Sequence, residues 1–540
     1  MAPGPVLTVT QARGTTGAPG RTSRGRGRAR TGLLALIAIS LLTMNGEASA
    51  RKPNLLFILT DNQPASILGA YGNPDVRTPH IDQLASEGMQ FTRAFAVSGM
   101  CSPTRATLMT GLMPSQHGVH NWLDDKEMQH WPREWSAIAE FRTLPLTLRN
   151  RGYQTALIGK WHLGQPWKAS IGYQHWITFT DGHTVDFWNN TVIENDDTYP
   201  VRDQHIVDFF TDKAVDYLKS YRGDSPFYLQ LNYDGPYLNP PTNQGPAKNR
   251  HYQSYLGQAF SSFPRVAFNA NVAAQLLDPS LPKFLQNMHL AAISQHNDLE
   301  TMANVASQNT VVDDGVGRVL ATLKEAGLER DTLVIFSSDQ GNFYGQHGLW
   351  QHTTVTTPSN LYEDALNIPL IIRQPGVVAP GSSSSELIGQ YDIPVTILDY
   401  LEITDATFDN SPGHSFAGRL RGEDVPLRTA VFYEQEESRG IRTQRFAYWK
   451  RLPGTGSDEF YDMDNDPGQH HNVIDNPAYK QVLGELDRQL LAHYSRYSES
   501  SFDLWQGGSA KGSVMRPGMF RKLYGTNWAT RTDQLPPFRE

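Results

Sequence analysis

The sequence predicts an α/β fold: a large, mostly parallel central sheet flanked by helices, then a smaller antiparallel sheet with a packing helix near the C-terminus. Continuous apolar runs of strand length are typical of parallel strands buried on both faces. Segments with helical spacing separate these runs. From about Arg428 onward, aromatic and charged residues alternate, which indicates antiparallel strands with one wet face. The apolar runs are residues 54–60, 153–158, 226–233 and 332–338.

The first fifty residues differ from the rest of the 540-residue chain. Six arginines precede an uncharged apolar run at 32–44, and Ala48-Ser49-Ala50 resembles a small-residue cleavage site. This pattern predicts a secretory signal peptide at residues 1–50 and export to the periplasm or the cell exterior. A membrane anchor is the alternative, but the run is short for a bilayer span. We therefore expect no stable membrane insertion after cleavage.

Charge and cysteine content restrict the function further. The formal net charge is −8, and it becomes −13 without the first fifty residues, which hold six Arg and one Glu. An acidic exported protein is a poor candidate for binding nucleic acid. The chain has a single cysteine, so its stability must come from its core and not from intramolecular disulfides.

The order of these patterns predicts the domain organisation. After residues 1–50, an N-terminal α/β domain is expected over residues 51–420 and a C-terminal α+β subdomain over 421–500. Residues 238–285, rich in Pro, Asn and Gln, predict an insertion or a long loop that contacts substrate. The extension at 501–540 is polar and glycine-rich, and it shows no readable pattern.

The single cysteine stands in the polar segment Cys101-Ser102-Pro103-Thr104-Arg105. Ser102 is a good N-cap and Pro103 suits a first helical position, so we expect Cys101 just before a helix N-terminus. Such a position favours anions, and Arg105 adds a permanent cation. A free cysteine is more often a small buried hydrophobe. The polar neighbours nevertheless favour an anion pocket that contains a reactive group.

An acid and an amide follow the first and the fourth predicted strands. Asp61-Asn62 ends the first strand, and Asp339-Gln340 ends the fourth. Ligand-binding residues of α/β proteins gather at the carboxyl ends of parallel strands. Two carboxylates and two amide oxygens suit a hard cation such as calcium or magnesium. A single aspartate such as Asp61 can also serve only to cap a turn.

The second predicted strand ends in Gly159-Lys160-Trp161-His162. The glycine lets the backbone approach a ligand, and Lys160 and His162 share one face if the strand continues. Taken alone, such a pair is more often a pair of surface polar residues. At the end of a buried strand it is a candidate for binding and proton transfer.

Three segments together resemble the formylglycine-dependent sulfatases of the alkaline phosphatase superfamily. Cys101 to Arg105 matches the C-x-P-x-R signature, 152–162 matches G-Y-x-T-x-x-x-G-K-x-H, and 345–349 matches G-x-H-G-L. The resemblance covers most of residues 53–495 and implies an alkaline-phosphatase-like fold. It also implies that a formylglycine-generating enzyme oxidises Cys101 to formylglycine (3-oxoalanine), whose hydrate is the nucleophile.

The resemblance assigns roles to the strand-end residues. Arg105 stabilises the nucleophile and Lys160 binds the sulfate, while His162 acts as the base that releases sulfate. A divalent cation, Ca²⁺ in preference to Mg²⁺, is held by the metal ligands Asp61, Asn62, Cys101, Asp339 and Gln340.

The chain departs from the family pattern at three positions. Asn62 replaces a second aspartate, Tyr237 replaces a histidine, and His352 stands nearest to a missing lysine. In the family, that histidine contacts the sulfate and assists the leaving group, and that lysine binds the sulfate. The proton donor for the leaving group therefore stays open among His352, His347 and Lys160. The resemblance implies the substrate-binding set Lys160, Tyr237, His183, His347 and His352.

The function that follows is hydrolysis of sulfate monoesters. Export, 11 Trp and 22 Tyr, and the long segment after Tyr237 favour a sulfated sugar or polysaccharide over a small aryl sulfate. Two alternatives stay open. One is a phosphonate or phosphate monoester hydrolase on the same fold, and the other is an exported carbohydrate-binding protein without activity.

Overall fold

We describe the fold from a computed structural model, which covers residues 52–123, 131–184, 186–237, 248–278, 283–426 and 428–531. The predicted signal peptide lies outside these residues. Lys52 onward forms one compact unit. Within the described ranges, no helix combines the length and the apolar character needed to cross a membrane.

The central sheet has eleven strands in the order β12-β2-β11-β8-β1-β7-β3-β4-β5-β6, with β13 paired to β2. Its middle, from β8 to β4, is parallel, and antiparallel strands flank it. The strands are β1 (Asn54–Asp61), β2 (Met89–Phe95), β3 (Gln154–Gly159), β4 (His175–Phe179), β5 (Asn190–Glu194), β6 (Asp197–Val201), β7 (Phe227–Pro236), β8 (Thr332–Ser338), β11 (Asn367–Arg373), β12 (Ser382–Ser384) and β13 (Ile388–Gly389).

The central strand β1 explains why its sequence is apolar without interruption. Leu55, Phe57 and Leu59 join the core on one face of the sheet. Leu56 and Ile58 join the core on the other face. Because successive side chains of a strand point to opposite faces, a strand covered on both sides needs apolar residues at every position.

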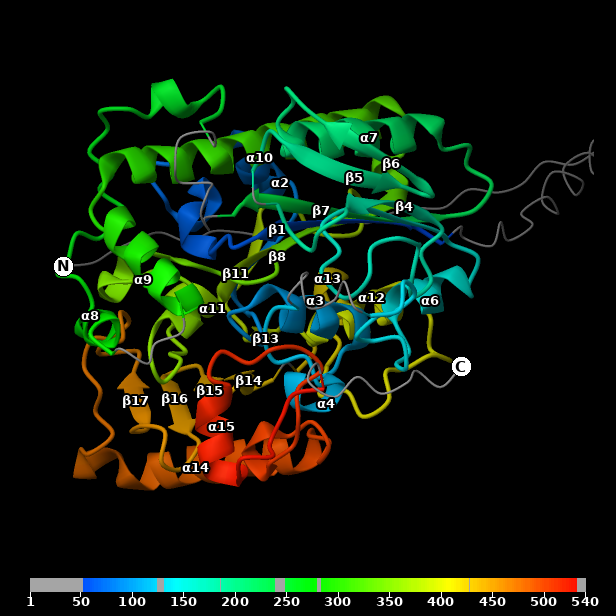
Figure 1. The fold of residues 1–540 in the computed structure, drawn as a ribbon. Helices are drawn as coiled ribbons and strands as arrows, with labels where there is room; N and C mark the ends of the chain where they lie inside the picture. The colour runs from blue at the N-terminus through cyan, green and yellow to red at the C-terminus, as the bar shows by residue number, and fades with distance from the viewer. Residues whose placement is uncertain are drawn as a thin grey trace, which may run out of the picture. The chain divides into compact units, whose positions relative to one another are not determined.

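Helices cover both faces of this sheet (Figure 1). α2, α7 and α10 pack on one face, and α3, α6 and α12 lie on the other. The arrangement is a three-layer α/β fold, as the sequence predicts. The helices are α2 (Pro79–Ser86), α3 (Cys101–Thr110), α4 (Pro114–His117), α6 (Leu144–Arg149), α7 (Ile206–Ser220), α8 (Ala270–Leu276), α9 (Lys283–Gln295), α10 (Leu299–Glu325), α11 (Glu363–Leu366), α12 (Asp392–Tyr400) and α13 (Ala417–Leu420).

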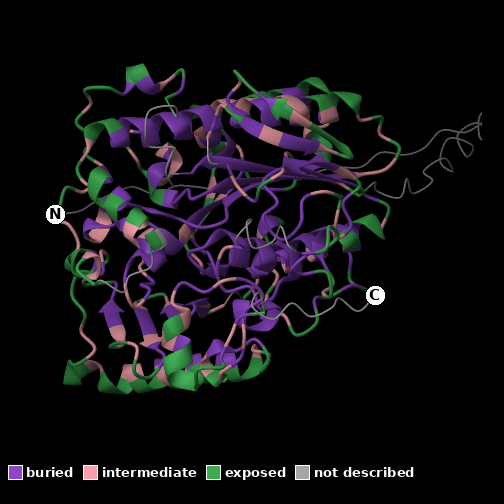
Figure 2. Ribbon diagram, in the orientation of Figure 1, coloured by how far each residue is buried: buried purple, intermediate pink, exposed green. Residues whose placement is uncertain are grey.

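A second sheet follows, antiparallel and four-stranded, in the order β14-β15-β16-β17. Its strands are β14 (Ala430–Gln435), β15 (Ser438–Thr443), β16 (Phe446–Arg451) and β17 (Glu459–Asp462), and α14 (Lys480–Arg496) packs on it. The exposed face of α14 forms part of the outer surface in Figure 2. The antiparallel sheet with one packing helix is confirmed.

The C-terminal extension has more structure than its sequence indicates. It contains α15 (Pro517–Tyr524). Leu504, Phe520 and Trp528 pack with Leu452, which lies in the connection between β16 and β17. Lys511 reaches inward, and its Nζ donates to the carbonyl oxygen of Ala137 at 2.8 Å. These contacts form between elements far apart in the chain, so no local period reveals them.

Candidate active site

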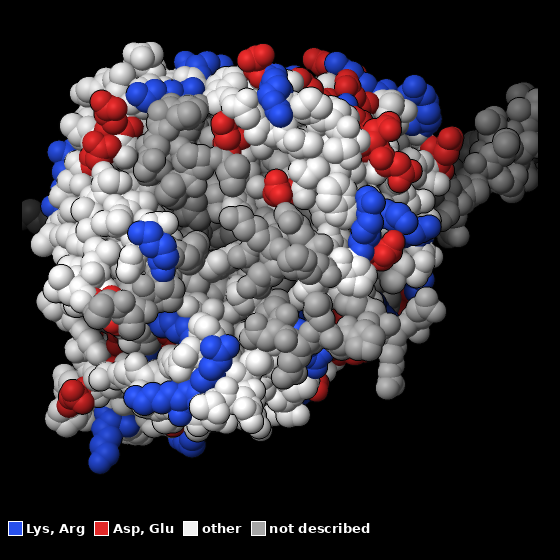
Figure 3. All heavy atoms as spheres, viewed as in Figure 1, with Lys and Arg blue, Asp and Glu red and all other residues white. Residues whose placement is uncertain are grey.

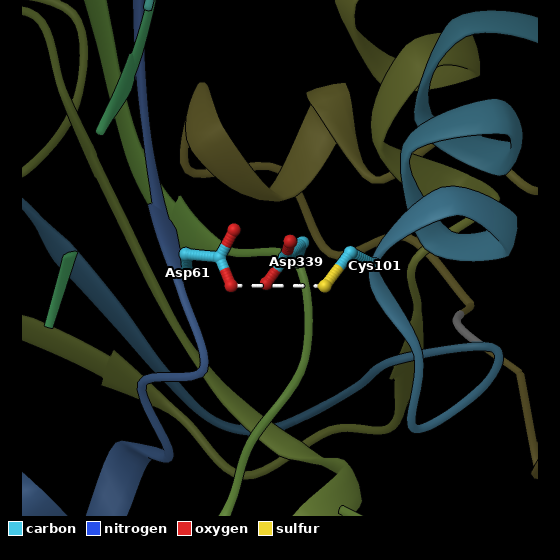
Figure 4. A group of neighbouring side chains, drawn as sticks. All are labelled: Asp61, Cys101 and Asp339. Atoms are coloured by element: carbon cyan, nitrogen blue, oxygen red, sulfur yellow. Dashed lines mark hydrogen bonds between the residues drawn. The ribbon is translucent and has the colours of Figure 1, made fainter. Parts of the chain in front are cut away.

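Three side chains meet at the carboxyl edge of the sheet (Figure 4). Asp61 ends β1, Asp339 follows β8, and Cys101 begins α3. The Cys101 Sγ lies 3.7 Å from Asp61 Oδ1, and one donor atom from each residue lies within 4.8 Å of the others. β1 and β8 are parallel neighbours, so their following residues emerge side by side.

The start of α3 differs from the prediction by one step. Cys101 is the first residue of the helix and Met100 is the N-cap, with an extended backbone. The Ser102 side chain does not cap the helix, because its Oγ accepts the Leu123 N–H at 3.0 Å. The Thr104 hydroxyl donates to the Cys101 carbonyl at 2.7 Å. The thiol therefore still lies at the positive end of the helix.

Two buried cations pair with these carboxylates. Arg105 Nη2 lies 2.8 Å from both Asp61 Oδ2 and Asp339 Oδ2. Lys160, just after β3, places its Nζ 2.6 Å from Asp61 Oδ2. Arg105 also donates from Nη1 to the Lys160 carbonyl at 3.2 Å, which ties the helix to the strand end.

Asp234 is a site residue to which the sequence assigned no role. It lies in β7, and its Oδ1 is 3.2 Å from Lys160 Nζ. Its Oδ2 accepts the backbone N–H of Thr184. The signal that could have found it is its position, since Asp61, Asp339 and Asp234 all stand at the carboxyl ends of neighbouring strands.

Amide groups and a histidine complete the side of the site nearest β8. Gln340 Nε2 donates to Asn62 Oδ1 and to Cys101 Sγ, the latter at 3.2 Å. Asn62 Nδ2 lies 3.0 Å from His352 Nε2. The backbone of Asn62 has a φ of 59°, a left-handed conformation that asparagine tolerates better than most residues.

A row of rings lies beside Lys160. The ring of Tyr237 is 4.7 Å from Lys160 Nζ. The His183 ring centroid lies 5.8 Å from that of Tyr237 and 5.6 Å from that of His162. His162 Nε2 is 3.1 Å from the Leu123 carbonyl oxygen, while its Nδ1 is buried with no partner among the described residues.

His347 does not belong to this group. Its Nε2 pairs with Asp364 at 3.3 Å, and its ring stacks on Tyr362 at a centroid distance of 3.8 Å. These contacts give no support to a role of His347 at the leaving group, which stays a prediction from the sequence. Its backbone turns away in a left-handed conformation, φ 54°, inside a 3₁₀ turn between β9 (Phe343–Tyr344) and β10 (Trp350–Gln351).

The electrostatics follow from burial and from this mixture of charges. Burial opposes ionisation, yet Lys160 and Arg105 hold the pKa of Asp61 below its ordinary value. Burial would lower the pKa of Lys160, but Asp234 and Asp61 raise it well above its ordinary value. Burial, with Lys160 and His183 nearby, lowers the pKa of His162 well below its ordinary value. Lys160 is therefore charged at neutral pH, and His162 is a neutral base.

The oxygen atoms around Cys101 fit a hard divalent cation. The Asp61 and Asp339 carboxylates are fully buried, and burial and the Asp61 charge raise the pKa of Asp339 to about 7. Two close, buried carboxylates repel each other, and a cation between them would relieve this cost. Asn62 Oδ1 and the Gln340 amide stand beside them, and rotation of that amide would present its oxygen.

Comparison with known proteins agrees with this geometry. A family model described as Sulfatase matches residues 53–403, and one described as N-sulphoglucosamine sulphohydrolase, C-terminal, matches residues 345–496. The N-acetylglucosamine-6-O-sulfatase of Bacteroides thetaiotaomicron is 25% identical over 534 residues, covering 87% of this chain and 92% of that protein. The human N-sulphoglucosamine sulphohydrolase is 29% identical over 410 residues, covering 73% and 71%.

Solved structures show the same fold. One, a complex with its substrate D-glucosamine-2-N,6-O-disulfate, superposes with a TM-score of 0.63 at 22% identity and covers 83% of this chain and 98% of that one. A phosphonate monoester hydrolase of Agrobacterium radiobacter superposes with a TM-score of 0.60 at 22% identity, covering 83% and 96%. At such identities the likeness establishes the fold alone.

Fold and site together define a hydrolase of the alkaline phosphatase superfamily. Within it, this chain belongs to the sulfatase family and is a sulfuric ester hydrolase.

Proposed function

We propose that this enzyme hydrolyses sulfate monoesters of sugars, with a nucleophile made from Cys101. The observation that carries the proposal is the buried pair of cations, Arg105 and Lys160, beside residue 101 at the carboxyl edge of the sheet. Two relatives, named N-acetylglucosamine-6-O-sulfatase and N-sulphoglucosamine sulphohydrolase, and the neighbour bound to a disulfated glucosamine support a sugar substrate. Figure 3 shows both acidic and basic side chains on the visible face, separated by wide areas without charge.

We propose further that Cys101 is converted to formylglycine. As a thiol it would be a poor nucleophile, because burial and the Asp61 carboxylate raise the pKa of Cys101 well above its ordinary value. The C-x-P-x-R segment is intact, and Ser102, Pro103 and Arg105 are all buried around the thiol. Conversion precedes folding in this proposal, since the finished chain buries the residue.

The residues that would hold a divalent cation are Asp61, Asn62, Asp339, Gln340 and residue 101, with Ca²⁺ preferred over Mg²⁺ for its tolerance of mixed oxygen ligands. When bound, the cation would supply charge neutralisation at a sulfate oxygen.

The protein's own side chains then divide the remaining work. Lys160 and Arg105 offset the negative charge of the sulfate, and their ion pairs keep both in place without reorganisation. His162 is neutral and has Nδ1 unpartnered among the described residues, so it can take a proton near residue 101.

For the leaving group, His352 is the hydrogen-bond donor that the geometry favours: its neutral ring can stabilise the departing oxygen through an N–H, without giving up that proton. Asn62 Nδ2 donates to its Nε2, which leaves Nδ1 as the N–H of the neutral ring. Nδ1 is buried with no partner in the described chain, as expected of a group that awaits the departing oxygen. Tyr237, whose ring lies 4.7 Å from Lys160 Nζ, offers its hydroxyl as a second donor near the site.

Export completes the proposal. The arginine-rich, apolar N-terminus and its small-residue cleavage site would direct the enzyme to the periplasm or the exterior, where sulfated polysaccharides occur.

Parallel rate assays test the proposed function. The same enzyme preparation is given an aryl sulfate, a sulfated monosaccharide, a phosphate monoester and a phosphonate monoester, with Cys101→Ala as the blank. We expect the sulfates to have the highest kcat/KM and Cys101→Ala to lose at least about 10³-fold. If sulfate were the slowest substrate, the phosphonate alternative would replace the proposal.

A further inference from the structure

A second group of buried polar side chains includes the two residues next to His352 in the chain. Gln351 and Thr353 flank that histidine, and both are fully buried. Gln351 Oε1 and Thr353 Oγ1 have no hydrogen-bond partner in the described part of the chain. Gln351 also has a φ of 81°, a strained conformation for a side-chain-bearing residue. Such strain is often retained where a side chain must be aimed at a ligand.

The helix α9 contributes a histidine to this group. His289 is fully buried, and neither of its ring nitrogens has a partner among the described residues. The helix is tied to the strand end, because Gln351 Nε2 donates to the Met288 carbonyl at 3.4 Å. Burial and nearby Arg516 lower the pKa of His289 to about 4. The ring is therefore neutral at pH 7 and offers one donor and one acceptor.

The C-terminal extension supplies the charge. Arg516 Nη2 donates to Thr356 O at 3.0 Å, Gln275 Oε1 at 3.2 Å and Thr354 O at 3.4 Å, all uncharged oxygens. Its Nη1 is buried and has no partner within the described ranges. Burial raises the pKa of the neighbouring Glu436 carboxyl and the Arg516 charge partly opposes this, so one acidic group also lies near the arginine. The unpartnered Nη1 can still bind an anion.

These groups would be costly if they served only the fold. A buried donor or acceptor without a partner destabilises a protein by about 1–3 kcal/mol. Here several such groups share one region, supplied by α9, by β10 and the segment after it, and by the residue before α15. Their chemistry is that of a sugar site: amide and imidazole acceptors suit hydroxyl groups, and the guanidinium suits a sulfate or a carboxylate.

We propose that His289, Gln351 and Arg516 form a subsite for a second anionic group on the sugar that bears the scissile sulfate. The inference rests on the proposed function and adds a substrate class to it: sugars with two negative charges. His352 links the two regions in the chain, because it follows Gln351 directly and its Nε2 lies 3.0 Å from Asn62 Nδ2. The oxygen that joins sulfate to sugar would lie beside this histidine.

The test uses three sulfated monosaccharides that share the scissile sulfate and carry, at one other position, a hydroxyl, a second sulfate or a carboxylate. The readout is the ratio of kcat/KM for each dianionic sugar to that for the hydroxyl sugar. We expect the wild type to prefer a dianionic sugar by about ten- to a hundredfold. The sulfate and carboxylate arms identify which anion is bound.

Arg516→Gln should reduce this ratio to within about twofold of unity. Arg521→Gln is the matched control, since Arg521 lies five residues further on in α15 and should retain the preference. His289→Asn provides a second variant if Arg516→Gln does not fold. A wild type without preference, or an Arg516→Gln enzyme that retains it, would overturn the subsite. Absence of activity on every sulfate would instead contradict the proposed function.

Discussion

Lys160 makes two buried ion pairs, with Asp61 and with Asp234. The pair with Asp234 fixes the position of the lysine that would bind sulfate. Asp61 Oδ2 lies at 2.6 Å and Asp234 Oδ1 at 3.2 Å from the lysine nitrogen. A buried cation between two carboxylates is fixed in position, whereas one carboxylate would allow it to turn. Asp234 is thus a positioning residue.

Replacing Asp234 by Asn tests this role. We expect kcat/KM on a sulfate ester to fall about 10- to 100-fold, and the unfolding temperature to fall as well, because a buried ion pair loses one partner. Asp212→Asn is the control, since its partner Arg318 is about half exposed and a surface pair contributes little. Equal activity of the two variants would show that Asp234 only fills space.

Sequence motifs identify a site residue when its role shows in the residues next to it in the chain. Cys101, Arg105, Lys160 and His162 stand in short signatures, and the structure brings all four to one place. His347 stands in such a signature too, yet a left-handed turn carries it to Asp364. Asp234, His289 and Arg516 have no signature, because their significance comes only from partners far away in the chain.

At the scale of elements, the close pairing of the ends of β3 and β7 requires a glycine at position 159. Gly159 has a φ of 111°, and a Cβ built on it would lie 1.8 Å from the Asn232 carbonyl oxygen. Only glycine lets the two strands stay paired while Lys160 turns into the site.

Gly159→Ala should therefore reduce both stability and activity. We expect a loss of about 3 kcal/mol or more in the free energy of unfolding, since both a steric clash and a positive φ are imposed. Gly152→Ala is the matched control, because Gly152 also has a positive φ, 85°, but has open space around its Cβ position. Chemical denaturation measures the free energy of unfolding of both variants. An equal loss in Gly152→Ala would show that the contact with the Asn232 carbonyl is not the cause.

The helix α7 begins at a titratable cap. His205 Nδ1 accepts the Val207 N–H at 3.3 Å, and Nε2 lies 3.1 Å from Gln308 Oε1. Burial lowers the pKa of His205 to about 3. The folded state thus binds this proton more weakly than the unfolded state, whose histidine titrates near 6.5.

The sign of the resulting pH dependence is fixed. The stability from neutral His205 is present above pH 6.5 and is lost as the pH falls toward 3, by at most about 1.4 kcal/mol per pH unit. His205→Asn keeps a capping acceptor and removes the titration. Denaturant unfolding at pH 7 and pH 5 should show a smaller loss for this variant than for the wild type. Identical losses would rule out His205 as a contributor.

For the whole molecule, the sequence predicts the sheet better than the connections between distant parts. The buried strands and the antiparallel C-terminal sheet have strong local patterns, and they are confirmed. The extension after residue 500 has none, yet its apolar residues complete a core with Leu452. The N–H of Met515 also donates to buried Glu436, at 2.8 Å to Oε1.

A chain that ends at Ser500 should therefore be less stable than the full chain. It would expose the Leu452 cluster and leave Glu436 buried without its backbone donor. We expect the unfolding temperature to fall by about 5 °C or more, or the protein to aggregate. The full chain, unfolded under the same conditions, is the reference. An unchanged transition for the shorter chain would show that the extension is dispensable to the fold.

The central claim is that residue 101 is the precursor of the nucleophile. Mass spectrometry of the peptide from Ala94 to Arg105, taken from protein made in its native host, tests it most directly. We predict the mass of an aldehyde at position 101, and capture of that aldehyde by a hydrazide reagent. An unmodified thiol in a preparation that hydrolyses sulfate esters would contradict the claim.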